Sequence, residues 1–182
     1  MKDPFAPNEI KIAVIDDKVH NGWDKAYTSM FTNSVVVCFD QNKKEFDAKK
    51  IALNIYNNKP NYFDNLRLLN FICYKKKDFS TALNFINEAI KINPNFAEAY
   101  NERGNALNEL KQLHAAIKSY DNAIKINPNY ADAYYNKGLV LHELKKIEKA
   151  IENYDMAINI NSNHLFAHYN KGFALQQLKK FD

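Results

Sequence analysis

Residues 96–129 read FAEAYNERGNALNELKQLHAAIKSYDNAIKINPN, and residues 130–163 read YADAYYNKGLVLHELKKIEKAIENYDMAININSN. The two stretches begin 34 residues apart and match in phase at most of their apolar and small positions. A fixed period of this length is typical of solenoids, in which each unit is one supersecondary element stacked on the next. The repeat therefore decides the fold.

The same period continues on both sides of these two units. Residues 62–95 read YFDNLRLLNFICYKKKDFSTALNFINEAIKINPN, and the last unit, HLFAHYNKGFALQQLKKFD, stops after 19 residues. We divide the chain into an N-terminal segment, residues 1–61, and an array of about three and a half repeats, residues 62–182. The units of the array are residues 62–95, 96–129, 130–163 and the partial unit 164–182.

Each unit is predicted to be a pair of antiparallel helices. Apolar residues recur three and four apart in two successive stretches of each unit, which is the period of a helix. Glycine and alanine lie where the two helices must approach closely, as at Gly104 with Ala116 and at Gly138 with Ala150. Asn-Pro-Asn endings stop the second helix, because proline is poor in a helix interior. The sequence thus predicts a mainly α fold in which neighbouring pairs bury their apolar faces against each other.

These positions closely resemble the tetratricopeptide repeat (TPR) family. The signature positions are Tyr100, Gly104, Leu107, Ala116, Tyr120, Ala123 and Pro128 in the second unit, and Tyr134, Gly138, Leu141, Ala150, Tyr154 and Ala157 in the third. Ser162 replaces the proline of the third unit, and His168 replaces the aromatic residue of the fourth. The first unit departs furthest, with Leu66, Asn70 and Cys73 in place of the aromatic, glycine and leucine. The resemblance covers residues 62–182 and implies a TPR-type α-solenoid.

The resemblance also implies a partner-binding groove along the first helix of each unit. The positions that line it are Glu98, Asn101, Asn105, Asn108, Asp132, Tyr135, Leu139, His142, Phe166, Tyr169, Phe173 and Gln176. Amides can bond the backbone of an extended peptide, and rings supply contact area at low rotamer cost. Glu102, Glu109 and Glu143 lie nearby, so a basic segment is the expected ligand. An ordinary hydrated surface is the alternative for any one of these residues.

Some relatives hold the carboxyl terminus of heat-shock chaperones with lysine and arginine in this groove. Asn105 and Asn136 resemble part of that clamp, but Phe166 and Asn170 stand where its basic residues should be. We therefore expect weak or no binding to such an acidic tail, and calorimetry would check this.

Arg103, Lys137 and Lys171 occupy one repeat position that is often leucine in the family. They form either a basic column for an acidic partner or long stems that cover apolar neighbours while their charges reach water. The second reading is favoured, because the YNKG form is ordinary for the family.

The N-terminal segment does not follow the repeat. The β-branched runs Lys11–Ile15 and Val35–Phe39 predict buried strands, and residues 23–31 and 45–57 are candidate helices. This order suggests the opening of a parallel α/β unit. The competing interpretation is a set of irregular helices that cap the first repeat.

The stretch KIAVIDDK, followed by NGWDKAYTSMF, resembles the start of a response-regulator receiver domain. That resemblance implies that Asp16 and Asp17 help bind Mg²⁺. Asp64 lies near the expected place of the phosphoacceptor, but Asn65 breaks the usual spacing and Asp64 falls inside the first repeat. The family's later elements have no room, so a working phosphoacceptor is not expected.

The composition and the absence of known motifs argue against several classes of function. The 25 basic and 21 acidic residues are interspersed, which disfavours a nucleic-acid footprint. Cys38 and Cys73 are expected to be reduced and buried. His164 and His168 lie four apart, but core packing is favoured over a metal site for them. No catalytic motif, cofactor loop or membrane-spanning run occurs, and no apolar run opens the chain, so we expect a cytoplasmic protein that is not an enzyme and needs no cofactor.

The array ends with a lone first helix, in which Phe173, Leu178 and Phe181 should be poorly covered. This helix is predicted to act as a cap, and truncation or self-association through it are the alternatives. The leading function is an interaction scaffold for a protein or peptide. The rivals are a signalling protein with a degenerate receiver-like N-terminus and the remnant of a longer repeat protein.

Overall fold

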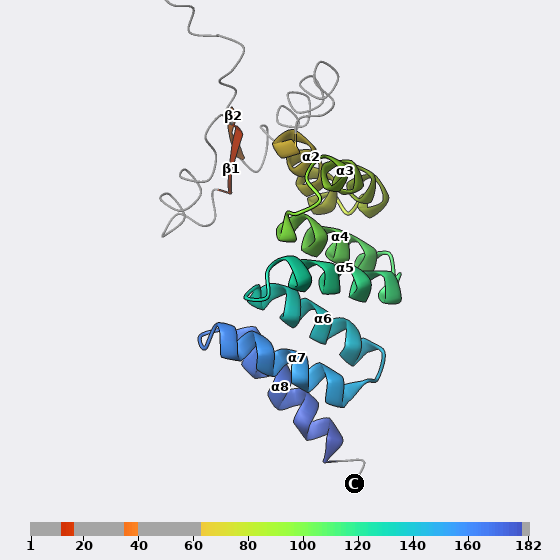
Figure 1. Ribbon diagram of the computed structural model, residues 1–182, viewed down its shortest axis with the longest axis vertical. Coiled ribbons are helices and arrows are strands. Elements are labelled where there is room, and N and C mark those ends of the chain that lie inside the picture. Colours follow the sequence, from red (N-terminus) through yellow and green to blue (C-terminus); the bar gives the residue numbers. More distant parts are fainter. Residues whose placement is uncertain (1–11, 17–34, 40–62, 180–182) are drawn as a thin grey trace, which may run out of the picture.

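The computed structural model describes residues 12–16, 35–39 and 63–179 (Figure 1). Within these residues the chain forms two short strands and seven helices. The helices follow one another along the long axis of the array, from α2 at one end to α8 at the other (Figure 1). Their bounds are Phe63–Lys75 for α2, Phe79–Ile92 for α3, Ala97–Glu109 for α4, Leu113–Ile126 for α5, Ala131–Glu143 for α6, Ile147–Ile160 for α7 and Leu165–Leu178 for α8.

The helices alternate between two roles. We call α2, α4, α6 and α8 the A helices, and α3, α5 and α7 the B helices. Each A helix packs on the B helix that follows it, as in α4 with α5, and each B helix packs on the next A helix, as in α5 with α6. Successive A helices also touch, as α4 does α6 and α6 does α8. The predicted solenoid of antiparallel helix pairs is confirmed.

The A–B interface is a tyrosine ring packed on a glycine. Tyr120 and Tyr154 are 1% exposed. A Cβ atom built on Gly138 would lie 2.6 Å from Cε1 of Tyr154, and one on Gly104 would collide with Tyr120 in the same way. Only glycine lets the ring lie this close to the A helix, because a methyl group would overlap it.

Small residues complete the interface, since Ala116 and Ala150 are fully buried. The first repeat buries the corresponding positions of its A helix with different residue types. Leu66, Asn70 and Cys73 are all buried there, although none has the usual residue type. Cys73 is buried, as predicted.

Two turns recur in each complete repeat. Between the A and B helices stands a lysine with positive φ, 61° at Lys77, 59° at Lys111 and 60° at Lys145. Such left-handed residues commonly end helices, although glycine or asparagine is the usual choice. After the B helix, an asparagine side chain accepts a hydrogen bond from the backbone N–H two residues later, over 3.0 Å from Asn129 N to Asn127 Oδ1.

The asparagine turn also forms where the proline is missing. Asn161 Oδ1 accepts from Asn163 N over 3.1 Å, although Ser162 replaces the proline between them. The Asn161 N–H meanwhile bonds to the Ala157 carbonyl, as the N–H of Asn127 does to Ala123. The first asparagine therefore shapes this helix end in both repeats, and proline is not required.

The N-terminal strands β1, Ile12–Asp16, and β2, Val35–Phe39, pair in parallel, with Ile12 opposite Val35 and Asp16 opposite Phe39. The two predicted strands are thus present. The candidate helices at residues 23–31 and 45–57, and Asp17, lie outside the described residues, so the receiver-like organisation stays a prediction. Asp64 lies in the first turn of the helix α2.

Candidate interaction surface on the A helices

The predicted groove positions lie on three A helices. They recur three and four residues apart within α4, α6 and α8, so each set shares one face of its helix. We call these twelve positions together the A-helix face. Its members are Glu98, Asn101, Asn105, Asn108, Asp132, Tyr135, Leu139, His142, Phe166, Tyr169, Phe173 and Gln176.

A hydrogen-bond ladder crosses this face from one repeat to the next. Arg67 bonds to Glu102, Asn136 Nδ2 donates to Asn101 Oδ1 over 3.0 Å, and Asn170 Nδ2 donates to the Tyr135 hydroxyl over 3.2 Å. In each case the two residues are 35 apart in the chain. Equivalent positions therefore make the contact in three successive junctions, although the residue types differ.

The first junction is ionic. The Glu102 carboxylate receives Arg67 at one oxygen and Asn70 Nδ2 at the other, over 3.1 Å. The Arg67 guanidinium also lies over the Phe96 ring, 4.6 Å from its centroid. Burial raises the pKa of the Glu102 carboxyl, and the nearby Arg67 charge and its hydrogen bond act against that rise. Glu102 therefore joins two repeats, and its charge is met within the array.

The second junction is an amide pair. Asn101 is 7% exposed, and besides accepting from Asn136 it donates to the Tyr130 hydroxyl over 3.4 Å. Asn105 is engaged as well, because its Oδ1 accepts from the hydroxyl of buried Tyr120 over 2.9 Å. These two amides, which sequence alone assigns to the groove, hold neighbouring helices together.

Replacing Asn101 by alanine is expected to destabilise the array by about 1–2 kcal/mol, because Asn136 and Tyr130 then lose a buried partner. Urea unfolding followed by circular dichroism measures this. A double-mutant cycle with Asn136→Ala should give a coupling of about 0.5–1 kcal/mol. Asn153 is a matched control, because its amide bonds to the Lys149 carbonyl of its own helix. If Asn153→Ala lowers the free energy of unfolding as much as Asn101→Ala does, the hydrogen bonds between repeats do not stabilise the array specifically.

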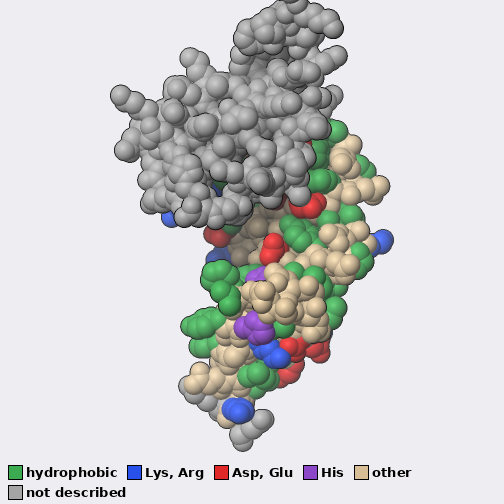
Figure 2. Space-filling model, turned by 90° about the vertical axis from the view of Figure 1, so that its left-hand side faces the viewer, with side chains coloured by type: hydrophobic (Ala, Val, Ile, Leu, Met, Phe, Trp, Pro, Cys, Tyr) green, Lys and Arg blue, Asp and Glu red, His purple; other side chains and the backbone are tan. Residues whose placement is uncertain are grey.

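The accessible part of the A-helix face lies toward α8. Phe166 is 70% exposed, Tyr169 74% and Phe173 46%. Asp132 and Gln176 are also exposed, whereas Glu98, Asn108, Leu139 and His142 are half-buried. In Figure 2, hydrophobic side chains gather at the left edge of the C-terminal half. The face thus changes from bonded amides in α4 to open rings in α8.

The rings on this face support one another. Half-buried Tyr135 lies 4.7 Å from His164 and 6.5 Å from Phe166 between ring centroids, and His142 lies 5.7 Å from Phe173. Burial raises the pKa of the Tyr135 hydroxyl, and the bond from Asn170 lowers it. Half-buried Tyr135 supports the cluster from the array side, while Phe166 and Phe173 remain exposed to solvent.

Of Arg103, Lys137 and Lys171, the two lysines form ion pairs and the arginine forms a hydrogen bond. Lys137 Nζ lies 2.7 Å from Asp121 Oδ1, and Lys171 pairs with Asp155 one repeat later. The Arg103 Nε donates to the Ser119 hydroxyl over 3.0 Å. The lysine side chains remain partly exposed, as expected, and the Arg103 guanidinium lies over the Tyr100 ring, 5.0 Å from its centroid. The expectation did not include the acceptor that each of the three also meets, on the preceding B helix or on the partner B helix. Each pair ties helices together.

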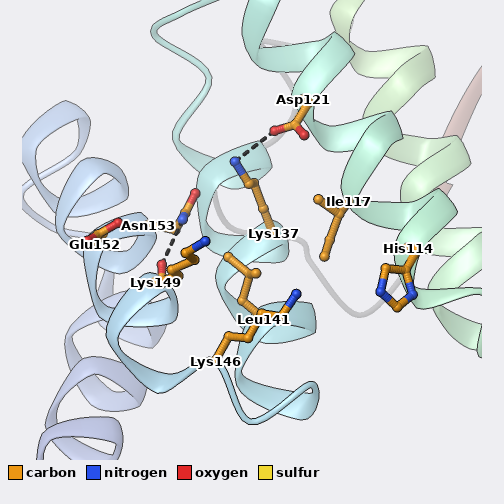
Figure 3. A pocket seen from close by; sticks show the side chains of 9 residues that line it. All are labelled: His114, Ile117, Asp121, Lys137, Leu141, Lys146, Lys149, Glu152 and Asn153. Carbon is orange, nitrogen blue, oxygen red and sulfur yellow. Dashed lines mark hydrogen bonds and ion pairs between the residues drawn. The ribbon is translucent and has the colours of Figure 1, made fainter.

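A hollow of about 330 Å³ lies among α5, α6 and α7 (Figure 3). It is lined by His114, Ile117, Asp121, Lys137, Leu141, Lys146, Lys149, Glu152 and Asn153. Figure 3 shows Lys137 turned to Asp121 across it. Its charges are of both signs, and none of its residues belongs to the A-helix face.

The two histidines of the last unit differ from expectation in part. His164 precedes α8, and its Nδ1 accepts from Ala167 N over 3.2 Å. His168 is exposed, and its Nε2 lies 2.9 Å from the Ser162 carbonyl oxygen. The prediction that His168 packs in the core is therefore wrong, because no described helix covers that side of α8. Among the described residues no three His, Cys, Asp or Glu side chains gather as metal ligands would.

Three family patterns match the chain. One described as TPR repeat matches residues 104–145, and two described as tetratricopeptide repeat match residues 131–164 and 85–118. The match to residues 131–164 spans the helix pair α6 and α7, and the other two cover parts of α3 to α6. Residues 85–164 are thus tetratricopeptide repeats.

Solved structures agree with this TPR assignment. The crystal structure of MamA is 27% identical, with a TM-score of 0.71 over 75% of this chain and 80% of that one. YrrB, described as a TPR protein with an unusual peptide-binding site, is 26% identical, with a TM-score of 0.66 over 70% of this chain and 66% of its own. The first TPR of Spaghetti (RPAP3), bound to the HSP90 peptide SRMEEVD, shares the fold at 21% identity, with a TM-score of 0.61 over 63% of this chain and 90% of its own. No curated protein matches the chain. None of the described helices is both long and apolar enough to cross a bilayer.

Proposed function

We propose that this TPR protein is a scaffold that binds an extended segment of another protein along the A-helix face. The observation that carries the proposal is the open ring cluster of Phe166, Tyr169 and Phe173, which continues a face built on Tyr135 and His142. Exposed aromatic side chains are enriched where proteins bind partners, because they bury large areas at low entropic cost. Peptide binding by TPR proteins named in the comparisons supports the same class of function.

The chemistry of the face favours a segment with apolar anchors and a basic residue. The rings of α8 would take the anchors, and the carboxylate of Asp132, whose side chain is 65% exposed, lies one repeat away on α6. An acidic tail is disfavoured, since Phe166 and Asn170 stand in place of basic side chains and Asn170 already bonds to Tyr135. The role needs no catalytic group or cofactor, and the cytoplasm remains the expected compartment.

Selection of peptides from a displayed random library tests this function. We expect peptides that bind the wild-type chain and bind at least about tenfold more weakly when Phe166 and Tyr169 are both alanine. Both side chains are exposed, so the double variant should keep its helix content. A matched control replaces the exposed Lys118 and Lys149 of the B helices by alanine and should change affinity by less than about twofold. The proposal fails if the control loses binding and the ring variant keeps it.

The parallel pair of strands β1 and β2 supports a second candidate function, that of a signalling protein. The parallel pairing of β1 with β2 is what a receiver-like segment requires, and Asp16 ends β1. In that reading the array is the output of a signalling protein. Labelling by acetyl phosphate that is lost in Asp16→Asn would support it, and the absence of any labelling would exclude it.

A further inference from the structure

The row of equivalent positions that contains Asn105, Leu139 and Phe173 begins on α2. Phe71 precedes Asn105 by one 34-residue period, so it is the member of this row in the first repeat. Its ring is 39% exposed, close to the 46% of Phe173. Helices α2 and α8 lie at opposite ends of the array (Figure 1). The row therefore has an open ring at each end, with an asparagine and a half-buried leucine between them.

Two hydrogen bonds join α2 to α4 around Phe71. Arg67, one helical turn before the ring, bonds to Glu102, and Tyr74, one turn after it, donates its hydroxyl to Glu109 Oε1 over 3.5 Å. Residues three and four apart share a helix face, so Phe71 lies between these two bonded side chains on one face of α2. This face of α2 continues the A-helix face of α4 by one repeat.

The charge beside Phe71 is opposite to the charge near the α8 rings. Lys75 Nζ lies 5.4 Å from the centroid of the Phe71 ring, and the next residues, Lys76 and Lys77, are exposed as Lys75 is. Toward α8 the open charge is the carboxylate of Asp132, whose side chain is 65% exposed. Charge complementarity fixes the register of a bound partner. A segment that complements both ends carries opposite charges at its two ends.

We propose that Phe71 receives a second apolar anchor of the partner segment, and that Lys75 selects an acidic residue beside that anchor. The inference rests on the proposed function, because it concerns the same face and the same ligand. The segment then has an acidic and an apolar residue at its α2 end, and an apolar and a basic residue at its α8 end. It lies across the A helices in one direction only.

The distance between the two open rings sets the length of the segment. Helix α2 is bonded to α4, and α4 touches α6 as α6 touches α8. Packed helices lie about 8–10 Å apart, so three such steps cover about 25–30 Å. An extended chain crosses this distance in about eight or nine residues. Peptides much shorter than this reach only one of the rings.

Peptides of about 15 residues, selected from a displayed random library on the wild-type full chain and labelled with fluorescein, are the probes. Fluorescence anisotropy should show that Phe71→Ala binds them at least about tenfold more weakly than the wild type. Ile92→Ala is the matched control, because Ile92 is also apolar, is 41% exposed in the same repeat and lies on the B helix α3. It should change the affinity by less than about twofold. Both variants should keep the helix content of the wild type, because both side chains are exposed.

A charge reversal tests the role of Lys75. Lys75→Glu should weaken binding about fivefold, the size of effect that an exposed ion pair gives. Replacing the acidic residue of the peptide by lysine should restore the affinity for Lys75→Glu and weaken binding to the wild type. A loss in Lys75→Glu that no such peptide restores would overturn the selection of an acidic residue.

The outcome at Phe71 separates this inference from the proposed function. Peptides that bind Phe71→Ala as tightly as the wild type, yet lose binding when Phe166 and Tyr169 are both alanine, would overturn the inference and leave the proposed function standing. If neither variant weakens binding, both fail. Equal losses in Phe71→Ala and Ile92→Ala would also overturn the inference. A wild-type dimer seen by sedimentation equilibrium and abolished by Phe71→Ala would assign the ring to a second copy and overturn the proposed occupant.

Discussion

Tyr154→Ala is expected to destabilise the array by about 3–5 kcal/mol, the range for removing a large buried aromatic side chain. The ring is 1% exposed and packs on Gly138 and beside Tyr135, whose ring centroid lies 6.0 Å away. Its removal leaves a cavity at the A–B interface of the third repeat. Because a solenoid is stabilised by contacts between neighbours, α8 should also lose its support. Urea unfolding monitored by circular dichroism measures the loss.

Tyr169→Ala is the matched control, because the same residue type is 74% exposed on α8. It should change the free energy of unfolding by no more than about 0.5 kcal/mol. If the two tyrosine variants lose similar stability, the ring-on-glycine interface does not hold the repeat together.

Gly138→Leu and Gly172→Leu should differ in sign. At Gly138 a Cβ would overlap the Tyr154 ring and lie 3.3 Å from the Ala150 carbonyl oxygen, so the two helices must separate. We expect a loss of about 3 kcal/mol, at the upper end of ordinary overpacking. At Gly172 nothing lies within 4 Å, and leucine is the better helix former, so a gain of up to about 1 kcal/mol is expected.

Thermal and urea unfolding of the two glycine variants beside the wild type gives both values. The same chemical change is made at the same position of two repeats, so helix propensity cancels in the comparison. Two losses of equal size would mean that a helix covers Gly172 as Tyr154 covers Gly138. Two equal gains would mean that Gly138 is not a contact point.

The sequence predicts the repeat, the helix pairs and the small residues between them, because these depend on period and volume alone. Gly104 and Gly138 lie where the pattern puts them, under the rings of Tyr120 and Tyr154. The left-handed turn at Lys111 could not be predicted, since lysine has no preference for positive φ. Backbone hydrogen bonds close the turn, from Lys111 N to Asn108 O and from Gln112 N to Leu107 O, each over 2.9 Å.

The candidate site was less predictable than the fold. Periodicity assigns Asn101 and Asn105 to the groove face, but it does not show that Asn136 and Tyr120 take their bonds. Those contacts depend on how far one repeat is rotated on the next, which no single repeat encodes. One signal was available: the ladder residues Arg67 and Glu102 are of opposite charge and stand 35 apart, one more than the period. The exposure of the α8 rings follows from the position of α8 in the array rather than from its residue types.

The most direct test of the central claim is a map of where a bound peptide touches the array. A library-selected peptide is titrated into the isotope-labelled chain, and amide chemical shifts are followed by nuclear magnetic resonance. The account predicts the largest shifts on the A helices, around Tyr135, Leu139, Phe166 and Phe173, with little change around His114 and Lys149 of the B helices. Shifts concentrated on α5 and α7, with the A helices unaffected, would contradict it.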